Sequence, residues 1–373
     1  MKIVYITDAL AIWGGLERVL IEKVNELTAR YGYEVNLLTT NQGNHPVPFP
    51  LHPNIVHRDL NIHLYKQYDY SGLYRLIKRT ELKRLFAKKL REHIDLIQPD
   101  IVVCVRSELL GVVNHIKGDI PVIYESHTLR FSQHFTAAGF CAQLKEKWYN
   151  LSARHAEMVI ALTEGDANDW MSLNRHVKVI PNIVHLNIRD RYCNYHSKSV
   201  IYVGRFDRQK DMYSLLLIWK LIHEKCPDWQ LHIYGGYGDE QEKLMAEINQ
   251  MDANIYAHDP TSVIFDKYLD SSVLLSTSLY EPFGLVLPEA MSCGLPVVAF
   301  DCPYGPSDII TDGVDGFLIK NRSIIDFAEK VCLLMEDVEL RKRMGKAGII
   351  SSKRYSADII MPLWQSLFEQ LAQ

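Results

Sequence analysis

Two glutamates, Glu281 and Glu289, flank a short loop in the segment Glu281-Pro-Phe-Gly-Leu-Val-Leu-Pro-Glu289. An apolar run typical of a strand precedes them. Pro288 suits the first position of a helix, which places Glu289 in a first turn, where the helix dipole stabilises a carboxylate by about 0.3–1 kcal/mol. Gly284 lets the loop backbone approach a ligand closely. We expect both carboxylates to face one site, although a lone glutamate at either position is more often a solvated loop acid or a helix-start acid.

Two cations, Arg205 and Lys210, follow another strand-like run in Tyr202-Val-Gly-Arg-Phe-Asp-Arg-Gln-Lys-Asp211. Gly204 allows a tight turn, and both cations then lie where the next helix opens. A diphosphate needs such neutralisation, and a helix N-terminus adds N–H donors. On charge alone, these side chains could equally be solvated surface cations. Arg208 is an extra cation with no assigned role.

The first half of the chain has two further candidate positions. Gly14 and Gly15 lie in Trp13-Gly-Gly-Leu-Glu-Arg18, between an apolar run and a helical pattern, and no GxGxxG dinucleotide fingerprint is present there. His127 lies in Glu125-Ser-His-Thr128, where a strand ends. The alternatives are a simple turn for the glycine pair and a buried, satisfied core histidine for His127.

These residues need elements to position them, and short β-branched runs alternate with helical patterns along the chain. In the first half the predicted strands are 2–7, 34–39, 101–105, 122–125 and 158–162, and the predicted helices are 16–31, 73–97 and 140–156. In the second half the strands are 200–203, 230–234, 254–257, 273–277, 297–300 and 316–318, and the helices are 212–225, 240–250, 262–269, 288–293 and 324–337. Such alternation is typical of parallel sheets covered on both faces, which bind ligands at the carboxyl ends of their strands.

The alternation occurs twice, on either side of a linker. We place the linker at 180–190, because that stretch breaks the pattern and polar residues 194–199 follow it. The prediction is therefore an N-terminal Rossmann-like domain over 1–185 and a C-terminal one over 195–354. The helical pattern 357–371 has no strand after it, so 355–373 is expected to pack back onto the first domain.

The two glutamates match the EX7E signature of retaining, family-4-type glycosyltransferases with the GT-B fold, and the chain resembles those that build bacterial surface polysaccharides. The residues around the signature also resemble the family, in Ser278-Leu-Tyr-Glu-Pro-Phe-Gly before it and Ala290-Met-Ser-Cys-Gly-Leu-Pro after it. Arg205 and Lys210 match the family's Gly-Arg-x4-Lys pair, and residues 14–18 resemble its Gly-Gly-x-Glu-Arg loop. The resemblance implies two facing Rossmann-like, doubly wound parallel-sheet domains with a central cleft and a C-terminal helix that crosses back.

The resemblance also implies a role for each candidate residue. Catalytic residues would be His127, Glu281, Arg205 and Lys210. The substrate-binding set would be Gly14, Gly15, Arg205, Lys210, Glu281, Phe283, Gly284, Leu285 and Glu289. Within it, Arg205 and Lys210 would bind the pyrophosphate, Glu281 the sugar hydroxyls and Glu289 the ribose. No metal or other cofactor is expected, since two cations can substitute for a metal, and loop 301–308 hints at a UDP-sugar donor.

Composition is consistent with a soluble protein. The chain has 373 residues, 47% hydrophobic and 23% charged, and a net charge of -4 gives no general attraction to nucleic acid. Seven scattered cysteines without a CxxC pair favour a reducing, cytoplasmic setting. No transmembrane run is expected.

The partners would be a nucleotide-sugar and a glycan or lipid-linked glycan acceptor. The alternatives are an epimerase or hydrolase of the same fold, or a non-catalytic sugar-nucleotide-binding protein.

The segment 66–93 contains nine Lys or Arg residues and three acids, with apolar positions that mostly keep helical spacing. One explanation is a solvated basic helix that packs on its own sheet. The other is a surface that docks on anionic lipid at the inner face of the plasma membrane.

Overall fold

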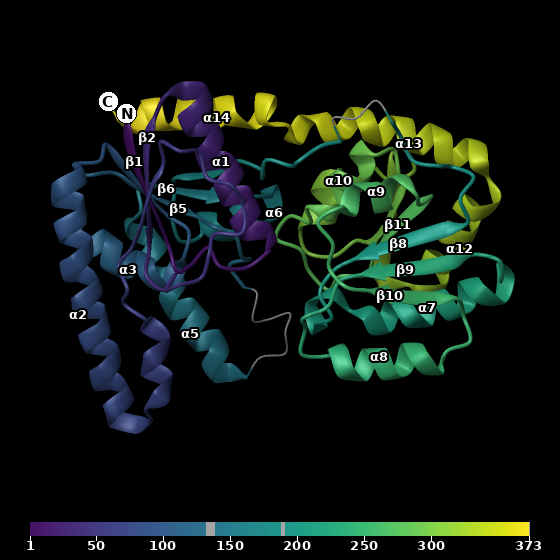
Figure 1. Cartoon of the computed structure of the whole chain (residues 1–373), viewed down its shortest axis with the longest axis horizontal. Coiled ribbons are helices and arrows are strands. Elements are labelled where there is room, and N and C mark those ends of the chain that lie inside the picture. The colour runs from purple at the N-terminus through teal and green to yellow at the C-terminus, as the bar shows by residue number, and fades with distance from the viewer. Residues whose placement is uncertain (132–138, 188–190, 373) are drawn as a thin grey trace. The chain divides into compact units, whose positions relative to one another are not determined.

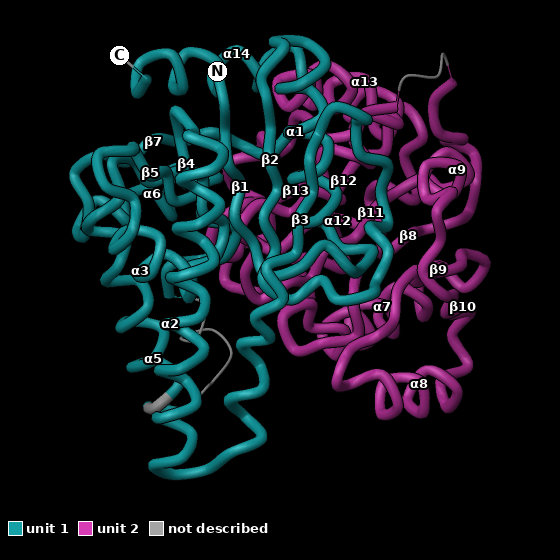
Figure 2. The backbone as a smooth tube through the Cα atoms, turned by 60° about the vertical axis from the view of Figure 1, so that its left-hand side comes forward, with its two compact units in different colours: residues 1–133, 138–183, 357–373 teal, residues 134–137, 184–356 magenta. Residues whose placement is uncertain are grey.

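The computed structural model of the chain describes residues 1–131, 139–187 and 191–372. It divides into two compact units, shown in Figure 2. Unit 1 contains the described residues up to Ile183 together with the last helix, and unit 2 runs from Val184 to Ser356. Residues 188–190 of the predicted linker lie outside the described part of the chain.

Unit 1 has, among its described residues, a seven-stranded parallel sheet in the order β3-β2-β1-β4-β5-β6-β7. The strands are β1 (Lys2–Thr7), β2 (Glu34–Thr39), β3 (Val56–Asp59), β4 (Ile101–Cys104), β5 (Val122–Glu125), β6 (Met158–Ala161) and β7 (Val177–Val179). The five predicted strands are confirmed. β3 and β7 were not predicted, because these two edge strands are short and only partly buried, so they carry no apolar run.

Helices cover both faces of this sheet (Figure 1). They are α1 (Gly15–Tyr31), α2 (Gly72–Ile97), α3 (Ser107–Ile116), α5 (Phe140–Asn150), α6 (Glu164–Met171) and α14 (Ala357–Leu371), with short 3-10 helices η1 (Leu64–Asp69) and η2 (Leu151–His155). One core lies under α2 and α3, and the other lies under α1 and α14. The predicted helix 140–156 is in fact α5 followed by η2, and α3 and α6 were missed because each follows a strand so closely that its apolar positions merge with the strand's.

Unit 2 repeats the architecture with a six-stranded parallel sheet, in the order β10-β9-β8-β11-β12-β13, over its described residues. The strands are β8 (Ser199–Val203), β9 (Gln230–Tyr234), β10 (Ile255–His258), β11 (Val273–Ser276), β12 (Val297–Phe300) and β13 (Gly316–Ile319). The helices are α7 (Met212–Lys225), α8 (Gln241–Gln250), α9 (Ile264–Leu269), α10 (Val286–Ser292), α11 (Gly305–Ile309), α12 (Ile324–Glu336) and α13 (Val338–Ser352), with 3-10 helices η3 (Arg208–Lys210), η4 (Lys320–Arg322) and η5 (Lys353–Tyr355). The predicted α/β class with two doubly wound parallel sheets is confirmed.

Two general expectations can be checked on the described residues. The six cysteines whose side chains are described are free and buried. No helix in the described ranges combines the length and the apolar character needed to cross a bilayer.

Candidate active site

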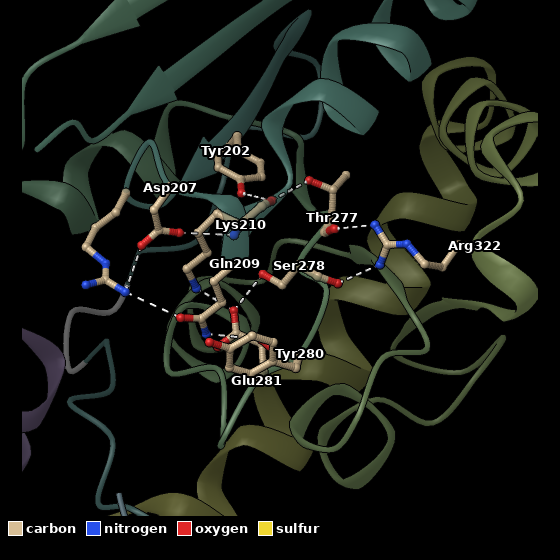
Figure 3. Close-up of polar contacts among 10 residues, drawn as sticks. Tyr202, Asp207, Gln209, Lys210, Thr277, Ser278, Tyr280, Glu281 and Arg322 are labelled. Atoms are coloured by element: carbon tan, nitrogen blue, oxygen red, sulfur yellow. Dashed lines mark hydrogen bonds and ion pairs between the residues drawn. The ribbon is translucent and has the colours of Figure 1, made fainter. Parts of the chain in front are cut away.

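Glu281 and Lys210 form the centre of a polar site in unit 2 (Figure 3). Lys210 ends η3, after β8, and Glu281 lies in the loop after β11, so both follow the carboxyl ends of adjacent parallel strands. Lys210 Nζ donates to Glu281 Oε1, and Ser278 Oγ donates to the same oxygen at 2.7 Å. The side chains of Lys210 and Glu281 are 15% and 6% exposed. This is a largely desolvated ion pair, so either group exerts a strong field on anything that binds beside it.

The main chain of Glu281 is fixed by the loop that follows β12. The Glu281 N–H donates to Pro303 O at 2.7 Å, and the N–H groups of Tyr304 and Gly305 donate to Glu281 O at 3.2 and 3.0 Å. A side chain at Gly305 would place its Cβ 1.9 Å from Phe283 O, so only glycine allows this approach. The loop 301–308 therefore holds Glu281 in place.

Arg205 lies in the loop between β8 and η3, and its side chain is 63% exposed. Its NH2 group is 2.9 Å from Asp207 Oδ2 and donates to Gln209 Oε1 at 3.4 Å. The structure thus brings Arg205 and Lys210 into one loop, as predicted. Each cation already has an acidic partner, Asp207 for Arg205 and Glu281 for Lys210.

Residues 204–210, which carry Arg205 and Lys210, form a loop that we call the cation loop. The glycine-rich loop after β9 packs against it. A Cβ at Gly235 would lie 1.8 Å from Gly204 O, and a Cβ at Gly238 would lie 1.8 Å from Phe206 O. The Gly204 N–H also donates to Tyr234 O at 3.1 Å. These two glycines therefore serve backbone-to-backbone contact beside Arg205.

The predicted helix start at Pro288 is wrong, because α10 begins two residues earlier, at Val286, with Leu285 as its N-cap. Pro288 is the third helical residue, and it is tolerated there because the first four N–H groups of a helix have no intrahelical acceptor. Glu289 still lies in the first turn, is 2% exposed, and accepts a hydrogen bond from Tyr268 OH at 3.3 Å.

The three loop residues between the glutamates differ in what they can offer a ligand. Gly284 has a φ of +94°, which favours glycine. Leu285 is partly exposed. The Phe283 side chain is 2% exposed and packs edge-on against Tyr355 with ring centroids 5.1 Å apart. A side-chain contact of Phe283 with a substrate is therefore unfavourable, and its ring belongs to the core.

The start of α7 differs from the expectation of a helix terminus with free N–H donors. Asp211 is the N-cap, and its carboxylate accepts from Ser214 N–H at 3.3 Å and from Ser214 Oγ at 2.6 Å. An acid thus already occupies part of the helix start.

In unit 1, Gly14 and Gly15 lie where α1 begins, after β1. Gly14 is the N-cap of α1, and Gly15 is its first residue. A Cβ on Gly14 would lie 2.2 Å from Oε2 of the buried Glu17, so a larger residue would displace that side chain. The pair therefore lies at the start of α1, at the carboxyl edge of the sheet.

His127 follows β5, and its side chain is 5% exposed. Its Nε2 atom lies 3.0 Å from Glu125 Oε1 without meeting the geometry of a hydrogen bond. Lys23 of α1 donates to both oxygens of Glu125. His127 is thus part of a buried charged group rather than an isolated histidine.

Sequence reasoning missed Lys23, Glu125 and Arg322. Lys23 had a signal, because it lies on the apolar stripe of α1 formed by Leu20, Val24 and Leu27, where a lysine is unexpected. Arg322 belongs to no motif, and only the folded structure reveals its contacts.

Two doubly wound parallel-sheet units, with a buried carboxylate and a Lys–Glu pair where strands of the second unit end, are the architecture of the GT-B fold. The family model described as Glycosyltransferase Family 4 matches residues 13–188, and the model described as Glycosyl transferases group 1 matches residues 192–350. The chain belongs to the family-4-type glycosyltransferases that combine these two domains.

Named relatives agree with this assignment. The chain is 28% identical to "Amylovoran biosynthesis glycosyltransferase AmsD" of Erwinia amylovora, over 98% of this chain and 99% of that protein. It is 32% identical to the poly(ribitol-phosphate) alpha-N-acetylglucosaminyltransferase of Staphylococcus aureus (strain COL), over 60% of this chain and 46% of that protein. The crystal structure of an S. aureus TarM mutant with fondaparinux, alpha-GlcNAc-glycerol and UDP aligns with a TM-score of 0.81 at 17% identity, covering 98% of this chain and 99% of that one. The structural likeness establishes a common fold.

Proposed function

We propose that this enzyme transfers a sugar from a UDP-sugar to a hydroxyl of a glycan or lipid-linked glycan, with retention of anomeric configuration, in the synthesis of a bacterial cell-surface polysaccharide. The Lys210–Glu281 pair carries the proposal, because it places a cation and a hydrogen-bond acceptor side by side at the end of a parallel sheet. A sugar diphosphate needs both, one for its phosphates and one for its hydroxyls.

Each side chain has one task in this proposal. Arg205 and Lys210 bind the diphosphate, Glu281 accepts hydrogen bonds from the sugar hydroxyls, and Glu289 accepts them from the ribose. In unit 1, His127 lines the reaction centre, and Gly14 and Gly15 allow close approach of the main chain to substrate. Loop 301–308 supports the arrangement, since it fixes the main chain of Glu281.

The proposed reaction exchanges two bonds on one face of the sugar. The bond from the anomeric carbon to the phosphate oxygen breaks, and its electron pair stays on the phosphate. The acceptor oxygen bonds to the anomeric carbon, and the acceptor proton moves to the leaving phosphate. Arg205 and Lys210 stabilise the charge that develops on that phosphate, which is where a preorganised charge lowers a barrier most. These two cations supply the charge that a metal would otherwise supply, and we propose that the reaction needs no metal or other cofactor.

The choice of UDP is supported by the TarM crystal, which contains UDP, and the polysaccharide role by the amylovoran-biosynthesis name of the relative that spans almost the whole chain. A thermal-shift screen of UDP-, GDP- and ADP-sugars tests the donor, because a ligand at 100 times its Kd stabilises a protein by about 2.7 kcal/mol. Stabilisation by a GDP-sugar instead would overturn the choice of base. Activity that EDTA abolishes and manganese restores would overturn metal independence.

The catalytic assignment is tested by Glu281→Ala and by the anomeric configuration of the product. We expect the variant to lose product formation by about 100-fold or more, as when a single transition-state contact is removed. Unchanged turnover would refute the role of Glu281, and an inverted product in NMR would refute retention. Consumption of the donor without any acceptor would favour the epimerase or hydrolase alternative. Donor binding without turnover under any acceptor would favour a non-catalytic binding protein.

We also propose that unit 1 docks on the anionic inner face of the plasma membrane, so that the enzyme works in the cytoplasm on lipid-linked acceptors. The basic segment 66–93 contains most of α2, and the two halves of this helix differ in burial. Leu82, Phe86 and Leu90 in the second half are buried in the core, as in an ordinary helix packed on its sheet. The first half of α2 lies next to η1 and α5. Large apolar side chains of α2 and α5 are exposed to solvent there, among them Leu73, Tyr74, Leu76, Ile77, Phe140 and Trp148.

Cations surround these exposed side chains. Arg79 and Lys83 lie over the Trp148 ring at 4.9 Å, and Arg75 lies over the Tyr68 ring at 4.4 Å. Nine cations against three acids over 66–93 complement a negative lipid surface, each cation adding roughly 1 kcal/mol near it. Aromatic rings with an apolar body and a polar edge suit the lipid–water interface.

Liposome flotation tests the docking. The exposed cations Lys66, Arg84 and Lys88 are changed together to glutamate, and Arg343, Lys346 and Lys353 of unit 2 are changed in the same way as a control. We expect the first triple variant to lose about 100-fold in binding to anionic vesicles and the control to keep it. Equal recovery of the unmodified enzyme with neutral and anionic vesicles would rule out electrostatic docking.

A further inference from the structure

Arg322 joins the two segments of unit 2 that carry Lys210 and Glu281. Figure 3 shows its bonds to Thr277 and Ser278, in the segment that carries Glu281. It ends η4, after β13, and is far from both segments in sequence. Its NH1 group donates to Ser278 O at 2.8 Å, and its NH2 group donates to Thr277 O at 2.9 Å. The same NH2 group forms an ion pair with Asp211. One guanidinium therefore ties the end of β11 to the start of α7.

The two segments also contact each other directly beside this guanidinium. Thr277 Oγ1 lies 3.0 Å from the carbonyl oxygens of both Lys210 and Asp211, and Tyr202 OH donates to Lys210 O at 2.8 Å. The Leu279 N–H donates to Gln209 O at 2.8 Å. Removing Arg322 would leave these weaker neutral bonds and the Lys210–Glu281 pair itself to hold the two segments together.

The backbone around this contact is strained. Asp211, Asn321 and Arg322 are non-glycine residues with φ of +44°, +54° and +50°. Such conformations cost of order 1–3 kcal/mol each and persist where the surroundings over-determine them, frequently at functional sites. Both ends of the Arg322–Asp211 ion pair are thus held in unfavourable backbone conformations. The Arg322 guanidinium also lies 4.2 Å from the centre of the Phe300 ring, which limits its freedom further.

We propose that Arg322 is a positioning residue of the donor site, which fixes the distance between the diphosphate-binding Lys210 and the sugar-binding Glu281. This inference rests on the proposed function. Arg322 acts through the main chain of Thr277 and Ser278 and through the Asp211 carboxylate, so its guanidinium is already committed to protein acceptors. It therefore belongs to the support of the site rather than to the groups that touch the donor.

A purely structural role would give Arg322 the same contacts, so the test needs a matched control. Ser323 is the neighbouring residue and the N-cap of α12, with its Oγ accepting from Asp326 N–H at 3.2 Å. Ser323→Ala removes that cap and lowers stability locally, but leaves the guanidinium in place. Arg322→Met removes the guanidinium with a side chain of similar length. Arg322→Lys keeps the charge beside Asp211 and loses the two-pronged geometry.

Two readouts separate positioning from stability. Hydrogen exchange of the Leu279 amide reports the contact between the two segments without any ligand. Calorimetric titration with UDP, followed by donor kinetics, reports the site. We expect Arg322→Met to raise the donor KM and to speed Leu279 exchange by about ten-fold or more, with Arg322→Lys intermediate and Ser323→Ala like the unmodified enzyme in both.

The outcomes are distinguishable. A folded Arg322→Met with the exchange and the UDP affinity of Ser323→Ala overturns the positioning role. If Arg322→Met does not fold, the same comparison with Ser323→Ala is made for Arg322→Lys, and equal exchange and UDP affinity again overturn the positioning role. If the unmodified enzyme binds none of UDP, GDP and ADP, the proposed function fails, and the exchange of Leu279 still shows whether Arg322 holds the two segments together.

Discussion

Lys23 and Glu125 form an ion pair inside unit 1 in which each side chain is only 2% exposed. Lys23 comes from α1 and Glu125 from the last position of β5. The Lys23 ammonium also lies 4.3 Å from the centre of the Trp364 ring of α14. Burial raises the pKa of Glu125, but the charges of Lys23 and then His127 outweigh it and lower that pKa to about 2. Glu125 is therefore an ionised group held directly beside His127.

Removing one charge of this pair should lower the free energy of unfolding more than removing both charges. Glu125→Gln leaves the Lys23 ammonium buried without a counter-charge, and such losses typically cost about 3–5 kcal/mol. The double variant Lys23→Met/Glu125→Gln removes both charges and should recover most of that free energy of unfolding. Urea unfolding, monitored by tryptophan fluorescence, measures the free energy of unfolding of the unmodified enzyme and of both variants. A double variant no more stable than Glu125→Gln would mean that the two charges do not interact as described.

The same pair predicts how stability depends on pH. The pKa of Glu125 is 4.5 in the unfolded chain and about 2 in the folded one. At a pH between these two values, Glu125 therefore binds a proton in the unfolded chain but not in the folded one. Stability from this group is therefore complete above pH 4.5 and is lost as the pH falls towards 2. We expect the double variant to show a shallower loss of stability than the unmodified enzyme over this window. Parallel acid-unfolding curves for the two proteins would contradict the assignment.

Asp207→Asn should strengthen nucleotide binding. Asp207 pairs with Arg205 at 2.9 Å and also caps η3 by accepting from Lys210 N–H at 3.2 Å. Asparagine keeps the cap and removes the competing charge, so Arg205 becomes free for a diphosphate. Because exposed ion pairs are worth about 0.2–1 kcal/mol, we expect a decrease of up to about five-fold in the Kd for UDP at low salt. The gain should shrink at high salt, and weaker binding of UDP at low salt would count against a phosphate role for Arg205.

Gly235→Ala should disrupt the cation loop without touching a ligand. The new methyl group would lie 1.8 Å from Gly204 O, so the backbone next to Arg205 must move. We expect a loss of stability of about 1–3 kcal/mol, as for other overpacking substitutions, together with weaker UDP binding. Gly139→Ala is the control, since a Cβ at Gly139 meets no atom within 4 Å and the residue does not have a positive φ. Similar UDP affinity for both variants would show that the glycine loop does not support the site.

The sequence predicted the parts of this protein that depend on local pattern. Buried parallel strands such as β1 and β12 are continuous apolar runs, so they were placed correctly, and the residues after their carboxyl ends were then natural candidates for a site. The start of α10 was misplaced because Pro288 is acceptable at any of the first helical positions, and the real start depends on the turn at Gly284.

What was missed depends on contacts between segments far apart in the chain. Gly235 needs to be glycine because of Gly204, and the role of Arg322 depends on Thr277, Ser278 and Asp211. The residues next to Gly235 and Arg322 in sequence do not identify these distant partners. Lys23 is intermediate, since its place on an apolar helix face signals a buried charge but not which residue neutralises it.

The packing of α14 has a consequence for the order in which the protein folds during synthesis. Trp364, Leu367 and Phe368 complete a core whose other members include Leu20 and Val24 of α1. These three residues leave the ribosome only after all of unit 2. Unit 2 can therefore complete its core before unit 1, although unit 1 begins first. Until α14 has been synthesised, the nascent unit 1 lacks the residues that cover the apolar face of α1, and this exposed apolar surface makes it the more aggregation-prone half of the enzyme.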